Sequence, residues 1–536
     1  MRKETSWPSW AIGGFSLALA GCGGGGSGVS STAADLTVSG TAAIGAAIAA
    51  AKVDVKCATG SGSVTTGADG SFSITVAGGA RPCTLRVPNG ASSLHSLVEA
   101  GSGTTVTANI TPLTDLLTAL VAGGPADALF TTFDATAQGR ASAAALATAK
   151  ADLASALKAQ IDLTGLDPLT GAAAVGSALD SKLIALATAL GSANLSLDAL
   201  ATALVANPGS PGPVQTILQT SATTCAGLRS GRYRAINPGE TDPVFATQVI
   251  QIDATALTVK QSDGTVGTLT DLGNCAFDTL EGTLLVAPSG FAVFHSSVSA
   301  FENALLIPEQ TIALSELAGT WNFVSYDRDA STLPFKPTTG YFTLDAAGHP
   351  SSNFTCTGQT NCVAESAGAG IAVSSGGGFE SVEAGGTVKI FAFKTASGGI
   401  IFVALPPGQS GLAIATKQIA RTLPAVGDVT KNRSFTIGSN GASSAISADE
   451  TRTVTAVNTT AQSYTRVRQS DGQIDGFSIN SPRNGMFYRP ASVSPINGGG
   501  TSNVSEILLM PLPGGASVFT SVTAPASFLG FSINHP

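Results

Sequence analysis

The sequence predicts a mainly β, multidomain protein with an Ala-rich helical middle. Apolar residues alternate at period two over residues 37–110, recur every three to four residues over 111–224, and alternate again from residue 225 onward. These are strand, helix and strand patterns. A chain of 536 residues also exceeds what one hydrophobic core supports. We therefore expect an N-terminal β-sandwich, a helical segment and C-terminal tandem antiparallel β units of barrel or sandwich type.

Near the N-terminus, an apolar run follows two basic residues and ends at a cysteine. Arg2 and Lys3 precede the run, and it ends in Leu19-Ala20-Gly21-Cys22. A charged start, an apolar middle and small residues before a cleavage point are typical of an export signal. The ending resembles the lipobox of bacterial lipoproteins. This resemblance implies that residues 1–21 are a signal peptide, that Cys22 is acylated, and that lipid attaches the protein to a membrane.

The alternative interpretation of this segment is a membrane-spanning helix. The run from Trp10 to Ala20 is shorter than the roughly 20 residues that a hydrocarbon core requires. The Gly/Ser-rich residues 22–36 follow it and form a flexible tether. In lipoproteins, an Asp after the cysteine often retains the protein at the inner membrane. Because Gly23 stands there, the resemblance implies the bacterial outer membrane, on either its periplasmic or its surface side.

The composition is mildly acidic and poor in charge. Loss of Arg2, Lys3 and Glu4 from 27 basic and 35 acidic residues leaves a net charge of −9. A chain with this balance has no broad basic surface, so we expect no nucleic-acid partner. Only 12% of residues are charged and 43% are hydrophobic, which is typical of secreted β-rich proteins and too apolar for wholesale disorder.

Six cysteines remain besides Cys22, and an even number in an exported chain favours disulfides. Fifteen pairings are compatible with six cysteines. Chain order, with one pair in each module, selects Cys57–Cys83, Cys225–Cys275 and Cys356–Cys362. No two cysteines have the C-x2-C spacing of a zinc site. The histidines are scattered singly, so we expect no metal and no cofactor: His95, His295, His349 and His535.

Residues 37–110 contain short alternating runs separated by turn residues. Lys52-Val53-Asp54-Val55-Lys56-Cys57 alternates, and Asp69-Gly70 stands before the alternating Ser71–Ile74. This pattern resembles the carboxypeptidase regulatory-like domain, a β-sandwich of the transthyretin type. The resemblance implies a non-catalytic module in which Asp69 is a turn residue. A calcium loop would need further carboxylates at regular spacing.

Residues 111–224 read as Ala-Leu helices. Four leucines mark one helical face after Pro112: Leu113, Leu116, Leu117 and Leu120. Further helices are expected over 143–157, 177–190 and 197–205. Only Phe130 and Phe133 are aromatic in this segment. Small side chains pack helices closely, so this region is predicted to be a scaffold.

The C-terminal region divides into three units, 225–312, 313–425 and 426–536. Val259-Lys260-Gln261-Ser262-Asp263-Gly264 recurs as Val467-Arg468-Gln469-Ser470-Asp471-Gly472. Such repetition favours related antiparallel units, although chance similarity between hairpins remains the alternative. A strand-turn-strand ending also recurs in all three units, over residues 284–294, 388–403 and 508–519.

Gly319-Thr320-Trp321 opens the middle unit, and Gly231-Arg232-Tyr233 opens the first. Gly-x-Trp on a first strand resembles the signature of lipocalins and related calycin barrels. The resemblance implies that Trp321 packs at the closed end of a barrel. Eight-stranded barrels are either filled by side chains or hold one small molecule, so both interpretations stay open.

Enzyme signatures are nearly missing from the sequence. Ser155-Ala156-Leu157-Lys158 fits S-x-x-K but has no matching K-T-G or S-D-N, and Tyr326-Asp327-Arg328-Asp329 reads as a solvated acidic loop. We expect a non-enzymatic, lipid-anchored envelope protein with a binding or structural role, whose partners are the membrane and an envelope protein. The alternatives are a carrier of a small apolar ligand and, with least support, a hydrolase of envelope polymers.

Overall fold

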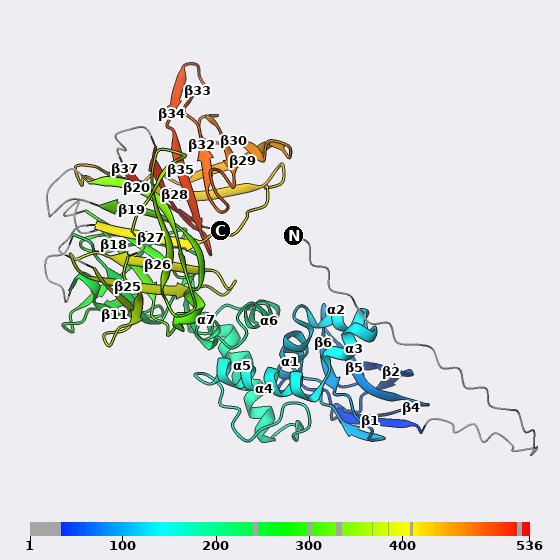
Figure 1. Ribbon diagram of the computed structural model, residues 1–536. Helices are drawn as coiled ribbons and strands as arrows, with labels where there is room; N and C mark the ends of the chain where they lie inside the picture. Colours follow the sequence, from blue (N-terminus) through cyan, green and yellow to red (C-terminus); the bar gives the residue numbers. More distant parts are fainter. Residues whose placement is uncertain are drawn as a thin grey trace, which may run out of the picture.

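The computed structural model is mostly β, with a helical middle, as the sequence predicts (Figure 1). Cys22, the expected signal peptide and most of the expected tether lie outside the described residues. The structure describes residues 34–239, 245–297, 303–327, 335–366, 368–383, 385–407, 411–522 and 528–535.

The N-terminal domain is a sandwich of two sheets. One has the order β4-β1-β7 and the other β3-β2-β5-β6. Val38, Val55 and Leu85 lie in the core between them. The carboxylate of Asp69 accepts hydrogen bonds from the backbone and hydroxyl of Ser71, so it is the expected turn residue. The strands are β1 (Leu36–Thr41), β2 (Lys52–Thr59), β3 (Ser61–Thr65), β4 (Ser71–Val76), β5 (Ala80–Asn89), β6 (Ser92–Val98) and β7 (Thr105–Thr107).

The helical segment packs on this sandwich through its first two helices. Thr111 and Thr114 form a reciprocal capping box at the start of α1, and the leucines at 113, 116 and 117 are buried. Within the described residues no single helix is long and apolar enough to span a membrane; α5 and α6 meet those criteria only as a pair bent by 91°. The helices are α1 (Pro112–Ala122), α2 (Ala126–Thr131), α3 (Ala135–Arg140), α4 (Ala143–Leu157), α5 (Ala178–Ser192), α6 (Leu197–Ala206) and α7 (Pro211–Ile217).

A short hairpin of β8 (Ser221–Ala222) and β9 (Cys225–Arg229) leads into three antiparallel units. Unit 1 contains β10 (Gly231–Ile236), β11 (Val249–Asp253), β12 (Thr258–Lys260), β13 (Val266–Thr268), β14 (Thr270–Gly273), β15 (Ala276–Asp278), β16 (Gly282–Val286), β17 (Ala292–Ser296) and β18 (Ala304–Pro308). Unit 2 contains β19 (Gly319–Asp327), β20 (Lys336–Leu344), β21 (Pro350–Thr357), β22 (Asn361–Ala364), β23 (Ile371–Val373), β24 (Phe379–Glu383), β25 (Gly386–Lys394), β26 (Ile400–Leu405) and β27 (Gly411–Lys417).

Unit 3 is a closed barrel of eight strands, with the hairpin β33–β34 inserted between β32 and β35. Its strands are β28 (Val429–Gly438), β29 (Glu450–Asn458), β30 (Ser463–Arg468), β31 (Ile474–Ile479), β32 (Phe487–Arg489), β33 (Ser492–Pro495), β34 (Thr501–Val504), β35 (Ile507–Leu512), β36 (Ala516–Ser521) and β37 (Phe528–Asn534). In every unit the first strand pairs with the last: β10 with β18, β19 with β27, and β28 with β37.

The fourth strand differs among the units and explains their different strand counts. In unit 1, β13 pairs with β12 and β14 with β15, and only Leu269 separates the two halves. In unit 2, β22 pairs with β21 and β23 with β24 across residues 365–370. In unit 3 the corresponding strand, β31, is continuous and pairs on both sides. The three units therefore share one meander of eight strand positions.

The sequence echoes occupy matching places in this meander. The two copies of the six-residue motif form the turns that follow β12 and β30, which are the third strands of units 1 and 3. The repeated strand-turn-strand endings correspond to β16–β17, β25–β26 and β35–β36, each just before the last strand. Position within the fold thus favours duplication over chance similarity of hairpins.

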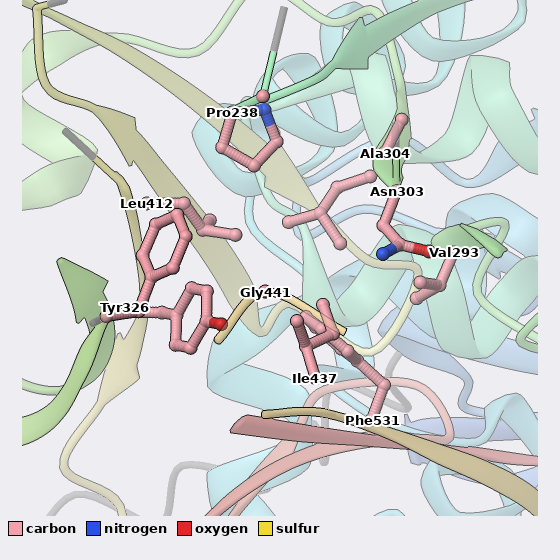
Figure 2. A pocket seen from close by; sticks show the side chains of 12 residues that line it. Pro238, Val293, Asn303, Ala304, Tyr326, Leu412, Ile437, Gly441 and Phe531 are labelled. Carbon is pink, nitrogen blue, oxygen red and sulfur yellow. The ribbon is translucent and has the colours of Figure 1, made fainter. Parts of the chain in front are cut away.

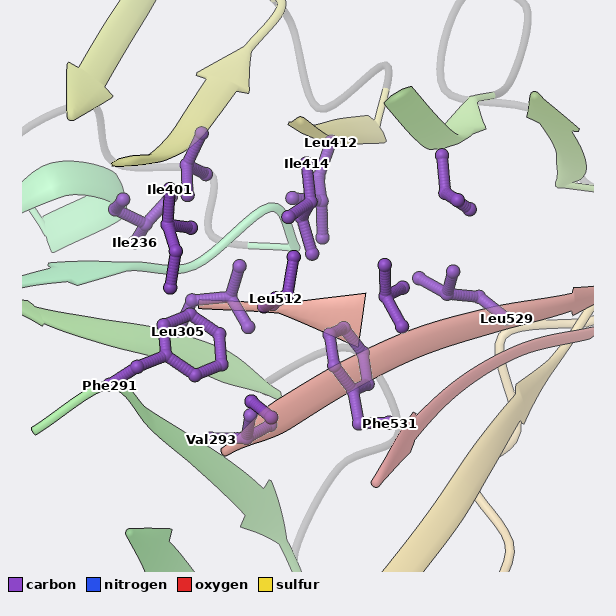
Figure 3. Close-up of a cluster of buried hydrophobic side chains, with 14 of the residues drawn as sticks. Ile236, Phe291, Val293, Leu305, Ile401, Leu412, Ile414, Leu512, Leu529 and Phe531 are labelled. Carbon is purple, nitrogen blue, oxygen red and sulfur yellow. The ribbon is translucent and has the colours of Figure 1, made fainter. Parts of the chain in front are cut away.

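The outward faces of the three units meet in one shared core (Figure 3). Phe291 and Leu305 come from unit 1, Ile401 and Leu412 from unit 2, and Phe531 from unit 3, and all five are buried. Strands such as β26 are buried on both faces because one face lines the interior of unit 2 and the other faces this core. The units are therefore joined by hydrophobic packing.

The structure contains the three disulfides that chain order selects. Cys57–Cys83 crosses the sandwich strands β2 and β5, Cys225–Cys275 ties β9 to the turn before β15, and Cys356–Cys362 closes the β21–β22 hairpin. Their sequence separations are 26, 50 and 6 residues.

Removal of Cys275 should lower the free energy of unfolding more than removal of Cys362. The chain entropy that each cross-link takes from the unfolded state corresponds to about 4 kcal/mol for the longer loop and about 2.4 kcal/mol for the shorter one. We expect the Cys225→Ala/Cys275→Ala variant to have the lower midpoint in urea than Cys356→Ala/Cys362→Ala. Equal midpoints would show that loop length does not control these contributions.

Candidate functional site

A small apolar cavity lies where the three units meet (Figure 2). Its volume is about 30 Å³, room for water-sized occupants and far below the roughly 300–1,000 Å³ of ligand pockets. Its polar side chain Asn303 is engaged, since it donates to the Ser443 hydroxyl at 2.7 Å and accepts from the Ser296 amide at 3.1 Å. The walls include Val293, Leu305, Tyr326, Leu412, Ile437 and Phe531.

Aromatic and polar contacts across the junction hold the units in place. Within unit 2, the Tyr326 and Phe335 rings stack with centroids 4.2 Å apart, and across the junction the Tyr326 hydroxyl donates to the Gly438 carbonyl of unit 3. His295 of unit 1 lies edge-on to Phe435 of unit 3, with ring centroids 4.8 Å apart. These contacts make the junction an assembly surface.

The interior of unit 2 is filled around Trp321. The indole is fully buried, and its Nε1 donates to the Leu317 carbonyl at 2.8 Å. Phe342 and Phe402 lie 6.2 and 5.5 Å from its ring, and Lys417 on the last strand lies 5.6 Å from it. Of the two interpretations left open by Gly-x-Trp, this packing favours a filled barrel.

Unit 1 repeats this arrangement with a tyrosine. Tyr233 is buried at the position where Trp321 stands in unit 2, and its hydroxyl accepts from the Arg229 amide at 3.2 Å. The Arg229 guanidinium donates to the carbonyls of Ala193, Ile217 and Gln219, which belong to the helical segment. This buried arginine joins the helices to unit 1.

The interior of unit 3 holds a cluster of charged side chains beside buried apolar ones such as Phe477 and Ile479. The strand register places the Asp475 face opposite the face that packs into the shared core. The Asp475 side chain is 0% exposed and accepts from Arg466 at 2.7 Å, Arg489 at 3.1 Å and Arg452 at 3.2 Å. Burial alone would raise the pKa of Asp475, but these guanidinium groups outweigh it and hold that pKa below its usual value.

A second layer of ion pairs extends this charged interior. Glu450 bridges Arg452 and Arg468 at 2.9 and 3.0 Å, and Arg468 also pairs with Asp471 at 2.6 Å. Three carboxylates balance most of the charge of the four arginines, so the network is suited to ordering the strands β29–β32.

This network was not predicted from the sequence, although the spacing of its residues is a signal for it. Arg466 and Arg468 stand two residues apart, and so do Asp471, Gln473 and Asp475. Alternation at period two places such residues on one face of a strand. Opposite charges on the same face of adjacent strands indicate paired groups.

The four histidines have separate polar contacts, and those of His95 include a second carboxylate, Asp127, at 3.4 Å from its Nε2. His95 is buried, and its Nδ1 lies 2.8 Å from Asp115; His295 Nε2 lies 2.8 Å from the Ser444 carbonyl. His349 and His535 lie 3.3 and 3.1 Å from Asp345 and Asp449 respectively. Among the described residues, no three His, Cys, Asp or Glu side chains gather as a metal-ligand set.

Two candidate motifs remain, S-x-x-K at residues 155–158 and the acidic segment at residues 326–329, and the structure corrects the prediction for the second. Ser155 and Lys158 are exposed at the end of α4. The expectation of a solvated loop from residue 326 is wrong at its start, since Tyr326 is buried and Asp327 ends strand β19. Burial raises the pKa of Asp327 to about 6. Both faces of β19 are covered near Tyr326, which the sequence did not indicate. Arg328 and Asp329 lie outside the described residues.

No known family model and no curated protein matches the sequence. Among solved structures, a protein of unknown function from the DUF3598 family of Nostoc punctiforme aligns with a TM-score of 0.15 and 10% identity, over 42% of this chain and 99% of that chain. Isotype 1 transferrin binding protein B from serogroup B Neisseria meningitidis aligns with a TM-score of 0.18 and 11% identity, over 54% and 59% of the two chains. A double mutant of the same antigen from Haemophilus parasuis Hp5 gives a TM-score of 0.17 and 8% identity, over 54% and 65%. None of these similarities assigns the chain to a family.

Proposed function

We propose that this protein is a lipid-anchored component of the bacterial outer membrane with a non-catalytic binding or structural role. The anchor would be the acylated Cys22, in the lipobox Leu19-Ala20-Gly21-Cys22. Several acyl chains bury enough CH₂ groups, at about 0.8 kcal/mol each, to hold a protein firmly at a bilayer.

The shared core is the observation that supports a presenting or contacting role. Three β units pack their outward faces together, and buried aromatic side chains occupy the interiors of units 1 and 2. The helices and the sandwich lie between these units and the anchor along the chain. A rigid body on a tethered spacer suits contact with another envelope protein.

Metabolic labelling with an alkyne fatty acid should mark the wild type and not a Cys22→Ala variant. Acylation requires the Cys22 thiol, so the variant should also move from the membrane to the soluble envelope fraction. Cys362→Ala is the matched control and should be labelled like the wild type. Equal labelling of wild type and Cys22→Ala would overturn the anchor.

The mature chain carries a single tryptophan, because Trp7 and Trp10 leave with the signal peptide. Emission from Trp321 therefore reports on the interior of unit 2. Addition of fatty acids or apolar dyes should leave this emission unchanged, since packed side chains surround the indole. Saturable quenching would contradict a non-carrier role.

A further inference from the structure

An arginine from unit 3 lies directly against a disulfide of unit 2. The Arg483 Nη1 lies 3.3 Å from Cys356 Sγ and 3.7 Å from Cys362 Sγ. Its Nε donates to Asn322 at 3.2 Å, and its guanidinium lies 5.1 Å from the Tyr341 ring. These contacts orient the positive charge toward the two sulfur atoms.

The other two disulfides have apolar surroundings. Cys57 and Cys83 belong to the sandwich core, and Cys225–Cys275 belongs to the core of unit 1. All four of those cysteines are buried. In the third pair, Cys356 is buried but Cys362 is partly exposed. Cys362 is thus the more accessible residue of this pair, and Cys356 Sγ is the sulfur nearer to the guanidinium.

We propose that Cys356–Cys362 is a thiol–disulfide exchange site, opened by dithiol reductants ahead of the other two disulfides because Arg483 stabilises the departing Cys356 thiolate. A guanidinium within hydrogen-bond distance favours the charged form of a thiol. A leaving thiol that is more easily ionised leaves faster, and a more stable reduced form makes its disulfide more oxidising.

The exchange proceeds in two nucleophilic displacement steps. A thiolate of the dithiol attacks Cys362 Sγ; the Sγ–Sγ bond breaks, a mixed disulfide forms on Cys362, and the electron pair stays on Cys356 Sγ. The second thiol of the reductant, as its thiolate, then attacks the reductant sulfur that is bonded to Cys362 Sγ. This closes a disulfide within the reductant and releases the Cys362 thiolate. The dithiol is oxidised by two electrons, and Cys356 and Cys362 are reduced by two.

The test treats the folded mature protein with dithiothreitol, traps free thiols by alkylation at timed intervals, and locates them by peptide mass spectrometry. In the wild type, Cys356 and Cys362 should be alkylated first. Arg483→Gln should slow their reduction by about fivefold or more, because the leaving thiolate loses its cation. Arg483→Lys keeps a charge there and should react at a rate between the two.

Arg421→Gln is the matched control. Arg421 also contacts unit 3, but its guanidinium donates to the Pro511 carbonyl, so its loss should leave the reduction rate unchanged. If Arg483 merely shields the disulfide, Arg483→Gln would speed reduction, and the sign of the change therefore separates the two roles. Faster or unchanged reduction would overturn the proposal. So would opening of either apolar disulfide first in the wild type, a result that needs no variant.

Discussion

Replacement of Asp475 by asparagine should lower the free energy of unfolding of unit 3 by about 3–5 kcal/mol, the usual loss when one partner leaves a buried ion cluster. The change preserves size but leaves three guanidinium groups without the carboxylate that they share. The amide NH₂ would also face those donors. Urea unfolding followed by circular dichroism measures the effect.

Asp471→Asn is the control for this prediction, because Asp471 pairs with Arg468 at the more exposed end of the same network, where the Asp471 side chain is 32% exposed against 0% for Asp475. Water screens that pair, so the control should unfold close to the wild-type midpoint. A similar loss in both variants would mean that the network acts through general charge and not through the buried carboxylate.

The contribution of Asp475 should also depend on pH. Since its folded pKa lies below the ordinary value of about 3.9, its contribution is fully present above that value and is lost as pH falls through the folded pKa. The stability difference between wild type and Asp475→Asn should therefore be constant near neutrality and shrink below about pH 4. A difference that grows on acidification would contradict the assigned direction.

Phe531→Ala should lower the free energy of unfolding by about 3–5 kcal/mol and should affect all three units together. The Phe531 ring lies in the shared core, packs 5.6 Å from Phe435, and lines the small cavity at the junction (Figures 2 and 3). Removal of the ring enlarges that cavity, because the packed strands around it cannot move in to fill the space. Hydrogen exchange should show faster opening in β17, β26 and β37 alike.

Phe528→Ala provides a matched loss of one ring from the same strand. Phe528 is only partly buried and packs against Phe519, outside the shared core. Its removal should cost less and should loosen unit 3 alone. If Phe531→Ala also loosened only unit 3, the units would not depend on a common core for their stability.

The local patterns in the sequence predicted most of the fold. Period-two runs located the strands, the leucines at 113, 116 and 117 marked the buried face of α1, and one cysteine pair in each module matches the disulfides of the structure. These features depend on residues near one another in the chain, where spacing alone determines which side chains share a face.

The features that the sequence did not reveal depend on distant contacts. The shared core joins strands from three units, and its local sign, the unbroken apolar run Ile400-Ile401-Phe402-Val403, is also compatible with a single buried hairpin. The break of the fourth strand at Leu269 follows from pairing with β12 on one side and β15 on the other. Likewise, the contact of Arg483 with Cys356 spans 127 positions.

The pairing of first and last strands sets an order of assembly during synthesis. Unit 1 can pair its first and last strands once β18 is available and unit 2 once β27 is available, but the shared core lacks the apolar side chains of unit 3 until β28 and β35–β37 have been made. A nascent or truncated chain that ends after Lys417 would keep the pairing of first and last strands in units 1 and 2 and would still expose apolar surface. The strands of unit 3 thus act as an intramolecular chaperone for units 1 and 2, because they cover apolar surface that would otherwise be exposed.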